Sequence, residues 1–195
     1  MKKHDRAMVW LVAAVGLVCG ISGCGGNPAA VPTSYDTYKA KDGSFQIQYP
    51  ANWEAKGGGV AGRAWAKFTS GNAEIAVEAD AAGSVMADIA QPNRVAGQEK
   101  DPNREAVAVV HTGEKSAFEE QTGVQEQDPT IVKTGLTDGR RSEFTGARTF
   151  GAPIHGYRAT VLSIDRRIRV VGQCSESQWE SLKPAFEKVI ASVSK

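Results

Sequence analysis

The chain is poor in several features that would each define a class of protein. It has three cysteines in 195 residues, which excludes a disulfide-dense miniprotein. Its formal net charge is +1, so no overall basic field attracts nucleic acid, and we expect no nucleic-acid partner. Its one apolar run, at 7–21, is too short to span a membrane comfortably. With 41% hydrophobic and 23% charged residues, the composition excludes a disordered chain and predicts one ordinary globular domain.

The common signatures of catalysis and cofactor binding are also absent. Beyond residue 23 the only histidines are His111 and His155, and neither has a second His or Cys at ligand spacing. The chain has no Gly-x-Ser-x-Gly elbow, no phosphate-binding loop and no dinucleotide fingerprint. We therefore expect a protein that is not an enzyme, with no catalytic residue and no cofactor. His155 is expected in a loop that enters a strand, as a surface or locally hydrogen-bonded residue.

Residues 1–23 have the build of an export signal. Three lysines or arginines within the first six residues precede the uncharged run at 7–21. The run ends in Ile-Ser-Gly-Cys24, which resembles the lipobox of bacterial lipoproteins. This resemblance implies cleavage before Cys24, a lipid on its sulfur, acylation of the new amino terminus (for example by palmitate) and hence the membrane as a partner. The alternatives are a secretory peptide with a chance cysteine and a membrane-spanning anchor.

The residue after the cysteine bears on the destination of the lipoprotein. Gly25 stands where Asp would favour retention in the inner membrane. By resemblance to enterobacterial sorting, we expect anchoring outside the cytoplasm, on the periplasmic side of the outer membrane if the host has two membranes.

A tether and one domain are expected after the signal. Gly, Pro and small residues dominate 25–34 without a charge, so 24–34 is predicted to be a lipidated cysteine with a flexible tether. The domain is predicted at 35–195, with Gly57–Gly59 as an internal loop. Cys19 is expected to be lost with the signal and Cys24 to carry the lipid, so no intramolecular disulfide is expected for Cys174.

Strand signals dominate the predicted domain. Alternating apolar residues predict a half-buried strand at 45–49 that ends at Pro50. Segments 63–69 and 73–80 predict a hairpin around Ser70-Gly71-Asn72, with one apolar face and one face that pairs basic with acidic residues.

A second hairpin is predicted over 157–174, with a two-residue turn at Asp165-Arg166. One of its faces collects small and aliphatic residues with Tyr157 and Cys174 and is predicted to be core, which makes Cys174 structural rather than reactive. The other face mixes arginines with aliphatic residues and requires partial cover. The fold predicted is therefore α+β: an antiparallel sheet with helices on both faces, an α/β/α sandwich.

Three helices are predicted from apolar spacing. They are a short one at 84–91, one over about 103–121 with Gly113 as a weak point, and one over 175–193. The last begins with a capping box formed by Ser175 and Gln178. It also contains Pro184, which predicts a kink or a restart. Its apolar stripe consists of Trp179, Leu182, Phe186, Val189, Ile190 and Val193.

Charge is uneven along the chain. Residues 99–128 hold eight acidic and three basic side chains, whereas 133–169 hold eight basic and three acidic ones. The simpler hypothesis is an acidic segment packed on a basic sheet within the molecule. The sharper hypothesis is a basic patch for an acidic partner or for anionic head groups. The candidate partner-binding residues are Trp65, Arg158, Arg167 and Arg169.

Two further groups of residues have both a structural and a functional interpretation. Trp53 is better explained as a plug at the sheet edge than as a binding residue. Glu78 and Asp80 lie on one strand face and could bind a cation, although Arg63 and Lys67 on the neighbouring strand could neutralise them. A calcium-retaining module would need about four or more oxygen ligands, drawn from Glu78, Asp80, Asp88 and loop carbonyls. We assign no metal ligand.

The two ends of the predicted domain carry a family resemblance. Residues 45–53 read Phe-Gln-Ile-Gln-Tyr-Pro-Ala-Asn-Trp, which resembles the opening of PsbP-like proteins: an alternating strand ending in Tyr-Pro, followed by a Trp. The last hairpin and the helix ending in Ala-Ser-Val193 resemble them too. The resemblance covers 35–195 with a divergent middle. It implies an antiparallel sheet between helices, a fold shared with a Ran-binding nuclear-import factor. PsbP is a photosystem subunit that assists retention of calcium and chloride, but none of its metal-binding residues can be matched here.

The sequence therefore predicts an envelope lipoprotein with a non-catalytic PsbP-like domain that binds or scaffolds a protein partner or a small ligand near the membrane. An exposed aromatic or apolar patch around Trp65 or on the arginine face would favour this hypothesis. The alternatives are a calcium-retaining module and a hydrolase with an unrecognised site, which would need a deep pocket with at least two convergent titratable groups.

Overall fold

The computed structural model of the chain describes residues 27–81, 105–147, 152–163 and 165–195. The predicted export signal, Cys24 and the helix predicted at 84–91 lie outside these residues. Within them, no helix is both long and apolar enough to cross a membrane.

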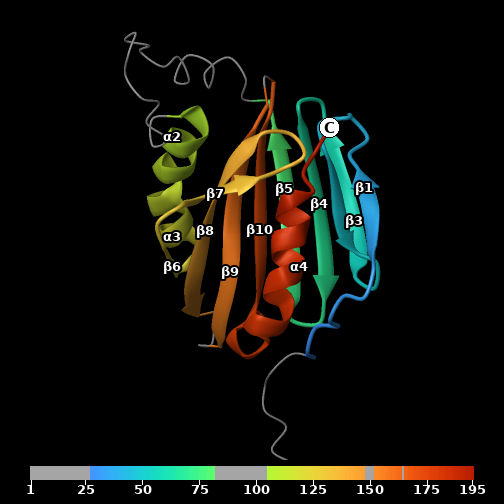
Figure 1. The fold of residues 1–195 in the computed structure, drawn as a ribbon, viewed down its shortest axis with the longest axis vertical. Coiled ribbons are helices and arrows are strands. Elements are labelled where there is room, and N and C mark those ends of the chain that lie inside the picture. The colour runs from blue at the N-terminus through green and yellow to red at the C-terminus, as the bar shows by residue number, and fades with distance from the viewer. Residues whose placement is uncertain (1–26, 82–104, 148–151, 164) are drawn as a thin grey trace, which may run out of the picture.

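An antiparallel sheet of eight strands forms the centre of the molecule (Figure 1). Seven strands follow the order β3-β4-β5-β10-β9-β8-β6. The eighth strand, β7, also pairs with β8, but with a different part of it than β6 does. The hairpin β1–β2 forms a separate two-stranded sheet. The strands are β1 Tyr35–Lys39, β2 Gln46–Pro50, β3 Glu54–Val60, β4 Arg63–Ser70, β5 Ala73–Asp80, β6 Val124–Glu126, β7 Thr130–Lys133, β8 Asp138–Ala147, β9 Pro153–Leu162 and β10 Arg167–Ser175.

Helices lie on both faces of the sheet. The helix α4 (Trp179–Ala191), preceded by the 3-10 turn η2 (Glu176–Gln178), packs on one face, where Trp179 meets Tyr157 of β9. The helices α2 (Ala106–Gly113) and α3 (Lys115–Thr122) are associated with β9, β8 and β6, and His111 meets Thr160 of β9. Residues 157 and 160 point to opposite faces because side chains alternate along a strand. The predicted α+β sandwich is therefore confirmed.

The face under α4 holds the main hydrophobic core. Alternate residues of β4, β5, β9 and β10 are buried there, as the alternation predicted, and so is Cys174. The whole predicted stripe of α4 and the residues after it is buried against them. Phe186 approaches β10 closely at Gly172, where an added Cβ would lie 2.9 Å from the ring. Trp53 is 4% exposed and packs edge-on against Phe186, so it fills the core, as its interpretation as a plug predicted.

The β9–β10 turn lies one residue earlier than predicted. Arg167 pairs with Leu162, and the Ser163 N–H donates to the carbonyl of Arg166 at 2.8 Å, so these two residues close the hairpin. The expected turn at 165–166 is therefore wrong by one position. The predicted face of each residue is still correct. Moving the turn by one residue shifts the pairing between the strands by two residues, and two residues is the side-chain period of a strand.

The run Gly57–Gly59 is part of β3 and is not the loop that its composition predicted. Glycine weakens a strand because it has no side chain to pack. Here neighbouring aromatic rings occupy the vacant space on both faces. An added Cβ would lie 1.9 Å from Tyr38 Oη at Gly57 and 3.1 Å from Trp65 Nε1 at Gly58.

The helices differ from expectation in three details. The segment predicted over 103–121 divides into α2 and α3 immediately after Gly113, its predicted weak point. The capping box is wrong: Ser175 makes no capping hydrogen bond, and the side chain of Gln178 bonds to both the N–H and the C=O of Ala29. The helix α4 continues through Pro184, so the expected restart does not occur, and the kink that was its alternative stays a prediction.

The segment expected to be a flexible tether is held against the domain over residues 29–34. Ala29 is buried in the main core, and its backbone is bound by Gln178. The carbonyl of Ala30 accepts from Trp53 Nε1 at 2.9 Å, and Ser34 accepts from the backbone of Ala51. These residues therefore belong to the fold, in contrast to the expectation of a tether through residue 34.

Candidate functional site

The sheet face opposite α4 divides into two parts with different surroundings. We call the part on β6, β8 and β9, which packs against α2 and α3, the covered half. The open half is the same face of β3, β4, β5 and β10, and no described helix packs across it. The predicted partner-binding residues fall on both halves: Arg158 on the covered half, and Trp65, Arg167 and Arg169 on the open half.

A buried polar network joins the covered half to α2. Arg158 Nε lies 3.0 Å from both carboxylate oxygens of Glu126, and its Nη2 donates to the carbonyl of His111 at 2.8 Å. The ring of His111 contacts Thr160 Oγ1 at 2.9 Å and Ser142 Oγ at 2.8 Å. All five residues are buried. The charge of Arg158 is paired within the molecule, as a buried charge requires, but its Nη1 has no hydrogen-bond acceptor among the described residues and lies 3.6 Å from Glu114.

The protonation of this network follows from its burial and its partners. Burial lowers the pKa of His111 below its usual value, and the neighbouring charge of Arg158 acts in the same direction. Burial by itself would raise the pKa of Glu126, but hydrogen bonds from His111 and Arg158 lower it on balance. The favoured state is a neutral imidazole beside an ionised Glu126–Arg158 pair.

Ion pairs inside the molecule bring the acidic and basic segments of the sequence together. Glu105 pairs with Arg140 at 3.1 Å, and Glu114 contacts Arg167 and lies 3.6 Å from Arg158. These contacts favour the intramolecular hypothesis over the basic patch. Arg158 is 1% exposed and therefore belongs to no accessible patch, contrary to the expectation for it.

The arginines of the open half remain partly exposed but have acidic neighbours. Arg167 lies 2.7 Å from Asp80, and Arg169 forms an ion pair with Glu78. Arg63 also lies 3.2 Å from Asp80. The two carboxylates considered as calcium ligands thus face arginines. The third, Asp88, lies outside the described residues.

Trp65 is the large apolar side chain at the centre of the open half, and it is 43% exposed. Its indole lies over Gly58, its direct partner on β3. The covered half contains the same arrangement: Phe144 lies over its partner Gly156. There, Phe118 of α3 covers the ring, with centroids 5.4 Å apart, and Phe144 is fully buried. Two equivalent aromatic–glycine pairs therefore differ in that one is capped and the other is open.

A second polar cluster surrounds His155, which the sequence placed in a loop and the structure places in β9. Its ring stacks on Trp179 with centroids 3.9 Å apart. Its nitrogens lie 2.6 Å from Glu143 and 3.0 Å from Glu176. Burial by itself raises the pKa of Glu143, but hydrogen bonding from His155 and the charge of Lys183 lower it on balance.

Sequence reasoning missed this cluster because its members come from four separate elements. One signal was available: His155 has the same strand parity as Tyr157, so extending the predicted strand by two residues would have placed it on the core face.

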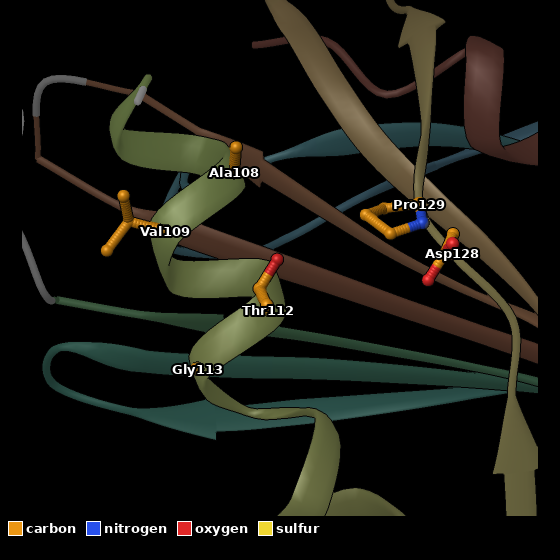
Figure 2. A pocket seen from close by; sticks show the side chains of 6 residues that line it. All are labelled: Ala108, Val109, Thr112, Gly113, Asp128 and Pro129. Atoms are coloured by element: carbon orange, nitrogen blue, oxygen red, sulfur yellow. The ribbon is translucent and has the colours of Figure 1, made fainter. Parts of the chain in front are cut away.

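Two open depressions lie beside these clusters. The first, of about 580 Å³, separates α2 from the chain before β7, with Ala108 and Thr112 facing Asp128 and Pro129 (Figure 2). The second, of about 560 Å³, runs along the ends of β8 and β9 and reaches Glu176. Each is lined by a single ionisable side chain. Within the described part of the chain, neither depression brings together the two titratable groups that the hydrolase alternative requires.

Comparisons with known proteins locate the fold. No protein-family model and no curated protein matches the chain. The solution structure of cyanobacterial PsbP (CyanoP) from Synechocystis sp. PCC 6803 is similar, with a TM-score of 0.56, 12% identity and coverage of 89% of this chain and 98% of that one. A Bacteroides thetaiotaomicron structure has a TM-score of 0.48, 10% identity and coverage of 81% and 47%. A Pseudomonas aeruginosa protein of unknown function has a TM-score of 0.44, 8% identity and coverage of 83% and 96%.

The CyanoP likeness extends over nearly the whole of that protein and shows that this chain has a PsbP-like fold. At 12% identity the likeness concerns the fold alone.

Proposed function

We propose that this chain is an envelope lipoprotein, anchored through Cys24, whose non-catalytic PsbP-like domain binds a protein partner on the open half around Trp65. The observation that carries the proposal is the difference between the two aromatic–glycine pairs. Phe144 is capped by Phe118, whereas Trp65 presents its ring to solvent. Tryptophan is enriched among the residues that dominate binding energy, and such residues are surrounded by polar contacts that exclude water.

The ion pairs around Trp65 suit a polar rim of this kind. On neighbouring strands, Arg63, Arg167 and Arg169 pair with Asp80 or Glu78, so the side chains are held in place and their charges are largely compensated. Exposed pairs of this type contribute little affinity but fix orientation and select against wrong partners. The open half therefore supports docking of a protein surface better than capture of a free ion or a small anion.

The anchor and the folded segment 29–34 together suggest where the domain would lie. If the lipid is on Cys24, only residues 25–28 separate it from the buried Ala29. The five Cα–Cα steps from Cys24 to Ala29 extend at most about 18 Å. The domain would then remain close to the membrane surface, which favours a membrane-associated partner.

A photo-cross-linking experiment tests the binding surface. A benzophenone side chain at Lys67, two residues from Trp65 on the same face, is activated in intact membranes, with the same group at Lys133 on the far edge as the matched control. We expect one protein adduct from position 67, reduced at least fivefold by Trp65→Ala and absent from position 133. The proposal is overturned if position 67 gives no adduct or if Trp65→Ala leaves the adduct unchanged.

Fractionation tests the anchor. We expect Cys24→Ala to move the protein out of the detergent-soluble membrane fraction, while Cys174→Ala stays in it. Retention of Cys24→Ala entirely in the membrane fraction would argue for a spanning anchor and against lipidation.

A further inference from the structure

The strand β3 forms one free edge of the sheet and is unusually open for an edge strand. It is seven residues long, six of these are exposed, and no other described strand pairs with its outer side. The opposite edge is divided between β6 and β7, of three and four residues. Sheet edges are commonly protected by short strands, prolines or bulges, because unpaired N–H and C=O groups accept further strands. β3 has no proline and is paired with β4 continuously from Glu54 to Val60.

The register identifies the backbone groups that are available. Val60 and Arg63 flank the two-residue turn Ala61–Gly62, and a β-turn is closed by a hydrogen bond between its first and fourth residues. Hydrogen-bonded and non-hydrogen-bonded pairs alternate along an antiparallel ladder. Ala55, Gly57 and Gly59 therefore direct their N–H and C=O groups toward the free edge. Two of the three are glycines and carry no side chain of their own, and Tyr38 lies over one of them, Gly57, on the face of the sheet opposite Trp65.

The charges beside this edge favour an acidic strand. Lys56 of β3 lies directly opposite Lys67 of β4. Like charges in directly opposite positions destabilise a sheet. The lysines contact Glu54 and Glu74 respectively, yet their side chains remain 66% and 45% exposed. A carboxylate placed opposite Lys56 on a strand added outside β3 would offset this repulsion.

Trp65 supplies a contact for the next position along such a strand. Its indole crosses from β4 to lie over Gly58, with Nε1 3.1 Å from the place of an added Cβ. A residue opposite Gly58 on an added strand would thus be next to the indole. The residue two positions earlier on the added antiparallel strand would meet Val60, which is 74% exposed.

We propose that β3 accepts an extended acidic segment of the protein partner as an additional antiparallel strand. Read from its amino end, the segment carries an apolar residue opposite Val60, an aromatic one opposite Gly58 and Asp or Glu opposite Lys56. Backbone hydrogen bonds supply the affinity and alternate side chains supply the selectivity, as in other strand-addition complexes. This inference rests on the proposed function for its surface and names the class of partner that the surface takes.

The test uses the full chain in detergent and a capped, labelled peptide, Thr-Val-Thr-Tyr-Thr-Glu-Thr, with binding followed by fluorescence anisotropy. A second peptide has Lys in place of Glu. A third carries N-methyl groups on alternate amides, which removes its edge-directed donors and keeps its side chains. We expect the Glu peptide to bind at least fivefold more tightly than the Lys peptide. Lys56→Glu should reverse this order, and the N-methylated peptide should lose binding.

Two further variants complete the design. Trp65→Ala should weaken binding of the Glu peptide about tenfold or more, whereas Lys133→Glu on the far edge should leave it unchanged; circular dichroism checks that each variant is folded. The inference is overturned if Lys56→Glu leaves the peptide order unchanged, if the N-methylated peptide binds as well as the parent, or if the chain only self-associates through β3. If position 67 still gives its Trp65-dependent adduct in that case, the proposed function stands and the strand-addition inference alone fails.

Discussion

The two faces of the sheet hold their helices by different physical means. On one face, α4 is packed through an apolar stripe, and the ring of Phe186 rests on the backbone at Gly172. On the other, α2 is joined to the sheet through His111, Glu126 and Arg158, all buried. Hydrophobic packing is non-directional and tolerates small shifts. A buried ion pair stabilises the fold only if its geometry and all its hydrogen bonds are satisfied. The first face should therefore set the stability of the domain, and the second should make that stability sensitive to single polar changes and to pH.

The largest effect is expected on the apolar face. Phe186→Ala removes a ring that is 1% exposed and contacts Trp53, Trp179 and Gly172. Large-to-small changes of this kind cost about 3–5 kcal/mol of unfolding free energy, because they remove buried surface and leave a cavity. Urea denaturation measures the loss. Glu180→Gln, on an exposed position of the same helix, should change it by less than about 0.5 kcal/mol. A loss below about 1 kcal/mol for Phe186→Ala would mean that α4 does not carry the core.

The next effect concerns the polar face and should be strongly non-additive. Arg158→Met leaves Glu126 ionised and buried, which costs about 3–5 kcal/mol. Arg158→Met combined with Glu126→Leu replaces the pair by apolar groups and should recover most of that loss. A double-mutant cycle from urea denaturation gives the coupling. The exposed pair Lys133–Asp138 serves as the control, and its coupling should be below about 1 kcal/mol. Additive losses at Arg158 and Glu126 would remove the distinction between the two faces.

The smallest effect is a dependence of stability on pH that arises on the polar face. The pKa values of His111 and Glu126 are both lower in the folded protein than their usual values of 6.5 and 4.5. In each case the unfolded chain binds the proton more readily. The stabilisation that each group contributes is therefore fully present above its unfolded pKa and is lost as pH falls through its folded pKa. For each proton, the unfolding free energy changes by at most about 1.4 kcal/mol per pH unit.

His111→Gln separates the two groups. This variant should reduce the decrease in unfolding free energy just below pH 6.5 and retain the decrease below pH 4.5. Urea denaturation at a series of pH values measures both. Phe186→Ala should lower stability equally at every pH and keep the wild-type slope. If His111→Gln retains the wild-type slope between pH 5 and 6.5, His111 is not a neutral, buried partner of the network.

Much of the apolar face could be predicted because its signals are local. Strand alternation placed Tyr157 and Cys174 in the core, and spacing placed the stripe of α4. The turn at 165–166 was wrong by one residue, since adjacent turn positions preserve the same faces. The strand at Gly57–Gly59 was missed because glycine has a low intrinsic strand preference, and the rings that compensate come from Tyr38 and Trp65.

Less of the candidate site could be predicted, because its character depends on partners far along the chain. Arg158, Arg167 and Arg169 look alike in the sequence. Arg158 is buried only because Glu126 and the carbonyl of His111, 32 and 47 residues away, meet it there. The exposure of Trp65 likewise depends on α2 and α3 lying over β6, β8 and β9 rather than over β4.

The sequence by itself determined the side-chain pattern of this protein: which residues alternate on each strand, which stripe of the last helix is apolar, and that charge is divided between two segments. These properties follow from the periods of a strand and a helix, which are fixed by backbone geometry. Only the tertiary structure decided which arginine is buried, which aromatic residue is exposed to solvent and which strand forms a free edge of the sheet. Burial and pairing are properties of the assembled sheet, because each is set by groups that the chain brings together over tens of residues.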